Sequence, residues 1–196
     1  MDSPFFSIII PTYNRSRFIT KAIESVMNQT FTHWELIIID DGSKDDTKEV
    51  IERYIQKDNR ITYYYQTNAE RSAARNHGIS KAKGKWICFL DSDDYYLTNH
   101  LQNFYTFLEK NNFNKGIYFC GVTIETGSKK EIVNKYKTNN ANNIEFVFEN
   151  ILGTPRACVS KNILDNDKFD TKLSVGEDTE LWVRIAEKNK VFFESF

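Results

Sequence analysis

Apolar and polar positions follow two alternating patterns along the first half of the chain. Short, continuous apolar runs rich in β-branched residues are typical of strands buried on both faces. Between them, apolar residues recur every three or four positions, which is the spacing of a helix with one buried face. The expected strands are Phe5–Ile10 (closed by Pro11), Trp34–Ile39, Ile61–Tyr65 and Trp86–Leu90, and the expected helices are Arg17–Met27, a segment after Ser43 that includes Val50–Ile55, and Ser72–Ala82.

This alternation of strand and helix predicts an α/β fold, a three-layer sandwich with a mainly parallel central sheet. In such sheets, ligands bind beyond the carboxyl ends of the strands. Those ends are polar or charged at all four expected strands, at Pro11–Arg15, Asp40–Ser43, Gln66–Arg75 and Asp91–Asp94. The pattern therefore predicts a ligand site at this edge.

The second half is less regular. Helices are expected at Leu97–Leu108 and Thr179–Lys188, extended segments at Gly116–Thr126 and Ala157–Ser160, and a mobile loop at Asn134–Asn143. Neither an internal repeat nor a linker divides the chain, so residues 1–196 are predicted to form one domain. Ser43 and Asp46 have the spacing of a capping box for the second helix.

Composition narrows the class of partner. The formal net charge is −1, so no global positive field attracts nucleic acid, and none is expected as a partner. Cys88, Cys120 and Cys158 lie far apart among apolar residues, which predicts buried, reduced thiols. Neither a signal peptide nor a run of ~20 apolar residues is visible, so we expect a cytoplasmic chain. The sequence carries no signal of an oligomeric state.

The acidic segment Asp91–Asp94 follows an expected strand. If it is extended, Asp91 and Asp93 project to the same side and can reach one cation. Mg²⁺ and Mn²⁺ prefer oxygen ligands, and such a metal neutralises charge on a departing diphosphate. The alternative is a polar turn whose acids cap the helix that follows.

The first two strand ends offer groups for a nucleotide. Tyr13 can stack on a base and Arg15 can meet phosphate, unless this segment only caps the following helix through Asn14 or Ser16. One carboxylate of Asp40–Asp41 can accept the imide N–H of uracil or guanine and would reject cytosine. The pair is also a plausible turn, since Asp-Gly follows.

Two further charged pairs stand near expected helix starts. Arg71 and Arg75 share a helix face that suits a diphosphate, or they form an ordinary solvated basic face. Glu177 and Asp178 open the last helix, whose dipole favours the ionised carboxylate. An ionised carboxylate can take the proton of an attacking hydroxyl. The alternative there is a routine acidic first turn.

Together these segments resemble glycosyltransferase family 2, the inverting enzymes of the GT-A fold. The resemblance rests on an ordered set of motifs along nearly the whole chain: Ser7–Arg15, Ile37–Ser43, Ala74–Asn76, Gly84–Lys85, Phe89–Asp94 and Gly176–Asp178 before Leu181–Arg184. It implies a nucleotide-sugar site formed by Pro11, Thr12, Tyr13, Arg15, Asp41, Arg75, Asp91 and Ser92. It also implies a Mn²⁺ or Mg²⁺ site at Asp93 with Asp91, and Asp178 as the catalytic base.

The resemblance further implies a donor half (1–94) and an acceptor half (95–196). A UDP-sugar is the expected donor, a saccharide or lipid-linked molecule is the expected acceptor, and peripheral contact with the cytoplasmic face of a membrane is consistent with the family. Relatives usually continue beyond the position of Phe196, which suggests C-terminal truncation. Many relatives also have a glycine where this chain has Glu70 and Arg71.

Two alternatives remain. A sugar nucleotidyltransferase has a similar sheet but typically a glycine-rich loop after the first strand, where this chain has Pro11–Arg15. A module that binds a nucleotide-sugar without turnover is favoured by the early end of the chain and disfavoured by the intact Asp93 and Asp178.

Overall fold

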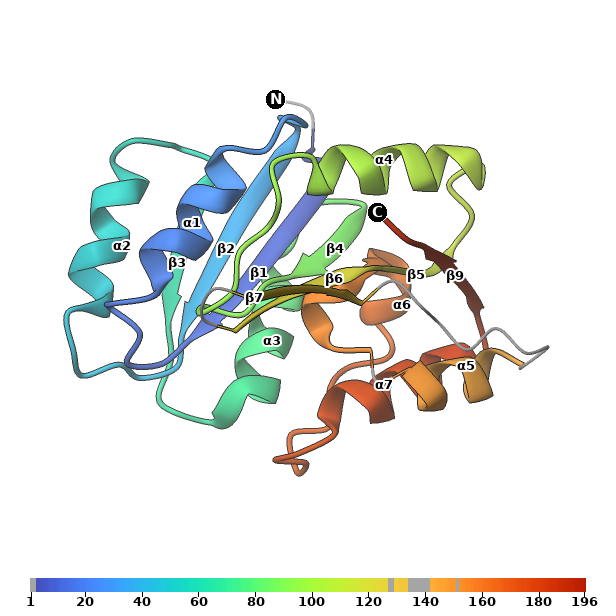
Figure 1. Cartoon of the computed structure of the whole chain (residues 1–196). Coiled ribbons are helices and arrows are strands. Elements are labelled where there is room, and N and C mark those ends of the chain that lie inside the picture. The colour runs from blue at the N-terminus through green and yellow to red at the C-terminus, as the bar shows by residue number, and fades with distance from the viewer. Residues whose placement is uncertain (1–2, 127–128, 134–141, 151) are drawn as a thin grey trace.

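The structure is a computed structural model that describes residues 3–126, 129–133, 142–150 and 152–196. A seven-stranded sheet forms its middle layer (Figure 1). In sheet order its strands are β3 (Ile61–Tyr65), β2 (Trp34–Asp40), β1 (Phe6–Thr12), β4 (Trp86–Phe89), β8 (Ala157–Ser160), β5 (Gly116–Cys120) and β9 (Lys190–Glu194). Within this sheet only β8 runs antiparallel to its neighbours. The predicted mainly parallel sheet is confirmed.

Helices cover both faces of the sheet, as the period-two alternation of strand side chains requires. One face packs α1 (Ile19–Met27), α2 (Thr47–Ile55) and α4 (His100–Lys110) against residues such as Ile8 and Ile38. The other face packs α3 (Glu70–Lys81), α5 (Asn143–Asn150), α6 (Lys161–Leu164) and α7 (Glu177–Ala186) against residues such as Ile9 and Ile37. The two separate cores confirm a three-layer sandwich.

Pro11 does not end the first strand, contrary to the sequence prediction. β1 continues through Pro11 to Thr12, which pairs with Asp40. The Leu90 N–H donates to the Ile9 carbonyl, and β4 has ended by this point. Since Pro11 faces the side that β4 has left, its missing N–H interrupts no ladder. Its ring therefore lies at the carboxyl edge of the sheet.

The second half departs from prediction in several places, since α5, α6 and β9 were not predicted and one extended segment is divided. The extended segment Gly116–Thr126 is two strands, because the chain leaves the main sheet after Cys120. The second of them, β6 (Val122–Thr126), pairs antiparallel with β7 (Lys129–Val133) in a separate hairpin. Most of the predicted 134–143 loop lies outside the described residues. All three cysteines are buried, as predicted.

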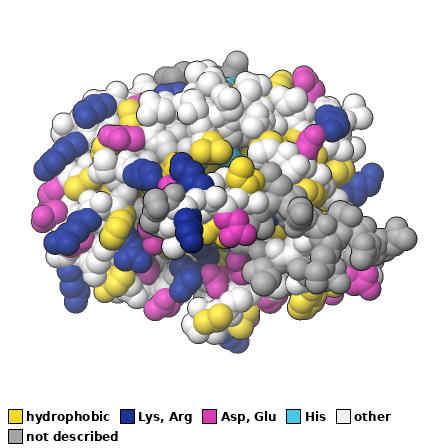
Figure 2. All heavy atoms as spheres, in the orientation of Figure 1, with side chains coloured by type: hydrophobic (Ala, Val, Ile, Leu, Met, Phe, Trp, Pro, Cys, Tyr) yellow, Lys and Arg dark blue, Asp and Glu magenta, His cyan; other side chains and the backbone are white. Residues whose placement is uncertain are grey.

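Lys and Arg side chains are interspersed with Asp and Glu on the face shown in Figure 2. In the part of the chain that the structure describes, no helix combines the length and apolar character needed to span a bilayer.

Candidate active site

A cavity of about 560 Å³ opens at the carboxyl edge of β1, β2, β3 and β4. We call it the donor cleft. Its volume lies within the usual range for small-molecule sites, about 300–1,000 Å³. Its lining contains every residue that the sequence implied for nucleotide-sugar and metal binding, together with four others: Pro11, Thr12, Tyr13, Arg15, Asp41, Asn68, Glu70, Arg71, Ala74, Arg75, Asp91, Ser92 and Asp93.

The loops after β1 and β2 are fastened to each other. The Asn14 N–H donates to Ser43 Oγ, and Asn14 Oδ1 accepts from the Lys44 N–H, each at 2.8 Å. Gly42 turns with φ +89°, and a Cβ there would lie 2.9 Å from the Asn68 backbone nitrogen, so only glycine fits. Neither the predicted capping box nor a helix cap from Asn14 or Ser16 forms, because the side chains of Ser43, Asn14 and Ser16 make hydrogen bonds between the two loops instead.

Asp40 and Asp41 have different surroundings. Asp40 is buried, accepts from the Ser43 N–H and from Tyr63 Oη, and does not line the cleft. Asp41 lines the cleft, and its Oδ1 accepts from Gln66 Nε2 at 2.7 Å and from the Ala69 N–H at 2.9 Å. Its second carboxylate oxygen has no recorded partner among the described residues. Of the two acids, Asp41 is therefore the one that can meet a ligand in the cleft, and the Asp-Gly turn aims it.

Sequence reasoning missed the side chains that hold Asp41. Gln66 donates to its carboxylate and also meets His77 Nδ1 at 2.8 Å, and Asn68 Nδ2 donates to its backbone carbonyl. Burial, with the positive charge of Lys81, lowers the pKa of His77. Their position directly after the third strand, at its carboxyl end, was the one feature of the sequence that pointed to Gln66 and Asn68. Together they fix the direction of the Asp41 carboxylate.

The segment Asp91–Asp94 is a turn rather than an extended strand. The Asp94 N–H donates to the Asp91 carbonyl at 3.0 Å, so Asp91 and Asp93 do not project to one side as predicted. Asp91 Oδ1 lies 2.9 Å from Arg75 Nη2, whereas Asp93 is 53% exposed and 3.8 Å from the exposed Arg15. The alternative of a helix cap also fails, since α4 has no side-chain cap.

Arg75 connects distant parts of the chain below the cleft. Its side chain is only 4% exposed, and it lies 2.9 Å from both Asp91 Oδ1 and Glu177 Oε1. Its Nε is buried without a hydrogen-bond partner among the described residues. The alternative of a solvated basic face is therefore wrong for Arg75. It holds for Arg71, which is 58% exposed and 3.8 Å from Glu177.

Glu70, at the start of α3, has an unusual backbone conformation. Its φ is +71°, in the left-handed region that favours glycine. The residue lines the donor cleft, a place where backbone strain is often retained for function.

The last helix is anchored so that its first turn lies near this network. Trp182 is fully buried, packs against Phe89 and Phe169, and donates from Nε1 to the Leu152 carbonyl at 2.7 Å. Glu177 is buried against Arg75, so the alternative of a routine exposed first turn is wrong for it. Asp178 is half-buried and is not among the residues that line the cleft; its Oδ1 accepts from the Thr179 N–H.

The acids present fit a metal that is shared with a ligand. Within the described residues, no group of three His, Cys, Asp or Glu side chains can enclose a metal ion. Mg²⁺, however, is usually held by one or two carboxylates together with substrate phosphates. Asp93 presents such a carboxylate to the cleft, and the buried Thr12 hydroxyl has no hydrogen-bond partner in the described structure. The exposed Asp93 carboxylate and the unpartnered Thr12 hydroxyl suit a phosphorylated ligand that arrives with its cation.

Comparison with known proteins decides the family. The sequence model of "Glycosyl transferase family 2" matches residues 7–159. The chain belongs to glycosyltransferase family 2. The matched segment contains the whole lining of the donor cleft, from Pro11 to Asp93.

Curated relatives of this glycosyltransferase chain are longer. An uncharacterized glycosyltransferase of Rickettsia bellii is 36% identical over 93% of this chain and 26% of its own length. A GalNAc(5)-diNAcBac-PP-undecaprenol beta-1,3-glucosyltransferase of Campylobacter jejuni is 32% identical over 97% of this chain and 62% of its own length. The chain spans about a quarter to a third of the length of its three Rickettsia relatives.

Solved structures confirm the GT-A fold. TarS 1-349 of S. aureus, solved in complex with UDP-GlcNAc, has a TM-score of 0.79 at 22% identity and covers 98% of this chain and 58% of its own. The mannosyltransferase PcManGT of Pyrobaculum calidifontis, solved with GDP-Man and Mn²⁺, has a TM-score of 0.75 at 17% identity. It covers 100% of this chain and 56% of its own.

Proposed function

We propose that this chain is an inverting glycosyltransferase domain that moves a sugar from a UDP-sugar to an acceptor hydroxyl with the help of a divalent metal. One observation carries the proposal. Four strand ends, separated by up to about 80 residues of sequence, bring all nine residues implied for donor and metal binding into one cleft. Family membership supplies the reaction class.

The base pocket follows from Asp41 and Tyr13. Gln66 and Ala69 orient the Asp41 carboxylate, which leaves one oxygen to accept the N3–H of uracil. Tyr13 is 44% exposed, so its ring can cover the base. Unprotonated cytosine presents an acceptor at N3 and would leave two acceptors facing each other. The pocket is therefore expected to bind UDP far better than CDP.

Arg71, rather than Arg75, is expected to contact the diphosphate. Both line the cleft, but Arg75 already meets two carboxylates at 2.9 Å and is buried. Arg71 stands at the start of α3 with its side chain exposed and only a long ion pair to Glu177. A helix N-terminus with a nearby guanidinium group suits phosphate oxygens. Arg75 then orients the acidic turn and the start of α7.

Asp93 would hold Mn²⁺ or Mg²⁺ together with the donor diphosphate, with Asp91 beside it as the counter-ion of Arg75. When bound, such a cation neutralises charge on the departing diphosphate. Asp178 takes the proton of the acceptor hydroxyl as that oxygen attacks the anomeric carbon. The bond from the anomeric carbon to the diphosphate oxygen breaks in the same displacement, so the configuration inverts and no sugar–enzyme bond forms.

The acceptor is a saccharide or a lipid-linked saccharide in this proposal. The name of the Campylobacter relative, which acts on an undecaprenol-linked molecule, supports it. Peripheral contact with a membrane face is consistent with such an acceptor.

Thermal unfolding with Mn²⁺ and a series of nucleotides tests the proposal. A ligand at 100 times its dissociation constant stabilises the native state by about 2.7 kcal/mol. In a domain of this size that corresponds to a rise in Tm of about 5–11 °C. UDP should produce it, GDP and dTDP less, and CDP least. If no nucleotide changes the Tm with or without metal, the proposal is wrong. Release of pyrophosphate would instead indicate a nucleotidyltransferase.

A further inference from the structure

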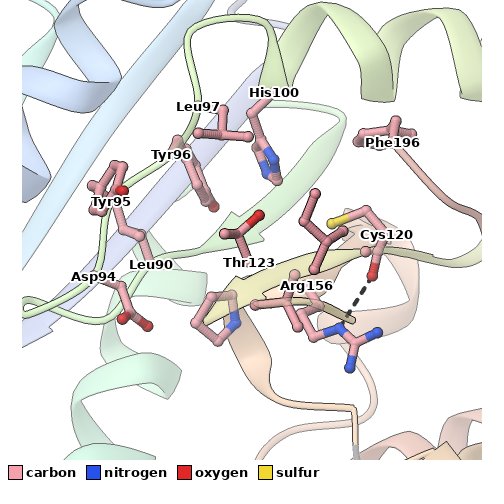
Figure 3. Close-up of a pocket in the computed structure, with 14 residues that line it drawn as sticks. Leu90, Asp94, Tyr95, Tyr96, Leu97, His100, Cys120, Thr123, Arg156 and Phe196 are labelled. Atoms are coloured by element: carbon pink, nitrogen blue, oxygen red, sulfur yellow. Dashed lines mark hydrogen bonds between the residues drawn. The ribbon is translucent and has the colours of Figure 1, made fainter. Parts of the chain in front are cut away.

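A second cavity, of about 260 Å³, adjoins the donor cleft. The two share the acidic turn as a wall, since Asp91, Ser92 and Asp93 line the donor cleft while Leu90 and Asp94 line the second cavity. The remaining walls come from the segment before α4 and its first residue, the junction of β5 and β6, the short helix η1 (Thr154–Arg156), Ile132 of β7 and Phe196 (Figure 3). A molecule in this cavity would lie directly beside a donor sugar.

The walls combine apolar surface with a few polar groups. Leu97, Val122 and Pro155 supply apolar surface. His100 points from α4 into the cavity, and its Nε2 is buried with no hydrogen-bond partner among the described residues. Burial lowers the pKa of His100 to about 3, so the ring is neutral near pH 7 and offers one hydrogen bond to a neutral group.

The charges disfavour an anion. Asp94 lines the cavity at the acidic turn, next in sequence to Asp93 and close to Asp91. A phosphate beside it would meet the same negative neighbours. The cation in the lining, Arg156, is buried and donates from Nε to the Cys120 carbonyl at 3.1 Å. A carboxyl group and a neutral imidazole are instead suitable partners for sugar hydroxyls.

We propose that this second cavity binds one uncharged pyranose ring of the acceptor, with Asp94 and His100 bonded to its hydroxyls and its C–H faces against the apolar walls. The volume is below that of sites for drug-sized ligands, about 300–1,000 Å³, and fits one ring rather than an oligosaccharide. The assignment of the ring as acceptor rests on the proposed function, because only a donor in the neighbouring cleft makes it a reaction partner.

Saturation-transfer NMR with UDP and Mg²⁺ present tests this site. The probes are the methyl pyranosides of glucose, galactose, N-acetylglucosamine and N-acetylgalactosamine, with glycerol 3-phosphate as the anionic comparison. Val122→Trp fills the cavity, and Ile124→Trp adds the same side chain on β6 outside the lining. His100→Phe keeps the ring shape and removes the hydrogen bond, so it tests the site even if Val122→Trp fails to fold.

At least one methyl pyranoside should bind wild-type protein, should lose its signal in Val122→Trp, and should keep it in Ile124→Trp. In His100→Phe it should bind about 3- to 10-fold more weakly. UDP should stabilise all variants equally. Absence of pyranoside binding, unchanged binding in Val122→Trp, or preference for glycerol 3-phosphate would overturn the inference. Pyranoside binding that Val122→Trp abolishes, in a protein that does not bind UDP, would keep the saccharide site and overturn the donor proposal.

Discussion

Replacement of Arg75 by methionine tests whether the buried ion network holds the site together. Arg75 lies 2.9 Å from Asp91, in the acidic turn, and 2.9 Å from Glu177, at the start of α7. Methionine preserves most of the side-chain volume and removes the charge. Glu177, only 6% exposed, is then left without its closest cation. The remaining cation, Arg71, is 3.8 Å away and largely exposed.

The expected cost follows from that burial. Removing one partner of a buried ion pair typically costs about 3–5 kcal/mol, because a charge stays buried and uncompensated. In a domain of 196 residues, 1 kcal/mol changes the Tm by about 2–4 °C, so the Tm should fall by about 6–20 °C. Urea unfolding followed by tryptophan fluorescence gives the same quantity as a free energy. Arg71→Met is the matched control and should cost at most about 1 kcal/mol.

A second substitution separates lost charge pairing from lost packing. Glu177→Gln removes the buried charge, so in the Arg75→Met background it should recover part of the lost stability. If Arg75→Met is as stable as the exposed control, or if the two substitutions are simply additive, the network does not carry the stability assigned to it.

Four further predictions concern function and pH. Asp93→Asn should abolish the gain in UDP affinity that Mn²⁺ gives, measured by calorimetry with and without metal. Asp178→Asn should leave UDP binding intact and slow sugar transfer by about 10²–10⁴-fold. Arg71→Ala should weaken UDP binding by roughly 10- to 100-fold and leave uridine binding unchanged, since it removes a charged hydrogen bond to phosphate. Burial opposes ionisation of Asp45, but hydrogen bonds that it accepts outweigh burial and lower its pKa from 3.8 to about 2, so Asp45→Asn should destabilise the protein at pH 7.

Each of these has a contrary outcome. A gain in UDP affinity from Mn²⁺ that persists in Asp93→Asn would show that Asp93 does not hold the metal. The pKa of Asp45 is lower in the folded than in the unfolded state, so its contribution is present above about pH 4 and lost as the pH falls toward 2. A stability difference that persists at pH 2 contradicts this. Undiminished turnover in Asp178→Asn would remove it as the base. Equal losses for UDP and uridine in Arg71→Ala would mean that Arg71 does not act on the phosphates.

Most of the sheet could be predicted because its strands are short, largely apolar runs bounded by polar ends, whereas the edge strand β9, Lys190–Glu194, was not predicted. The third strand, Ile61–Tyr65, and β8, Ala157–Ser160, agree with prediction residue by residue. The extension of β1 past Pro11 could not be predicted, because it depends on where the neighbouring strand β4 ends. The break after Cys120 likewise depends on pairing with β7, which local sequence does not encode.

The cleft could be predicted because parallel strands bring their carboxyl ends together, which fixed the neighbourhood of Asp41 and Asp93. The side-chain partners of the cleft residues could not be predicted from the sequence. Asp41 rather than Asp40 faces the cleft with its carboxylate held by Gln66 and the Ala69 N–H. The direction of the Asp91 carboxylate depends on its ion pair with Arg75. The place of Glu177 in the network with Arg75 depends on the buried anchor of α7.

The central claim is that the donor cleft binds a UDP-sugar, and a crystal structure of the protein with UDP and Mn²⁺ tests it most directly. The account predicts uracil between Tyr13 and the Asp41 carboxylate, phosphate oxygens at Arg71, and the metal bound by Asp93 and the diphosphate. UDP bound at another surface, or uracil placed away from Asp41 with no metal at Asp93, would contradict it.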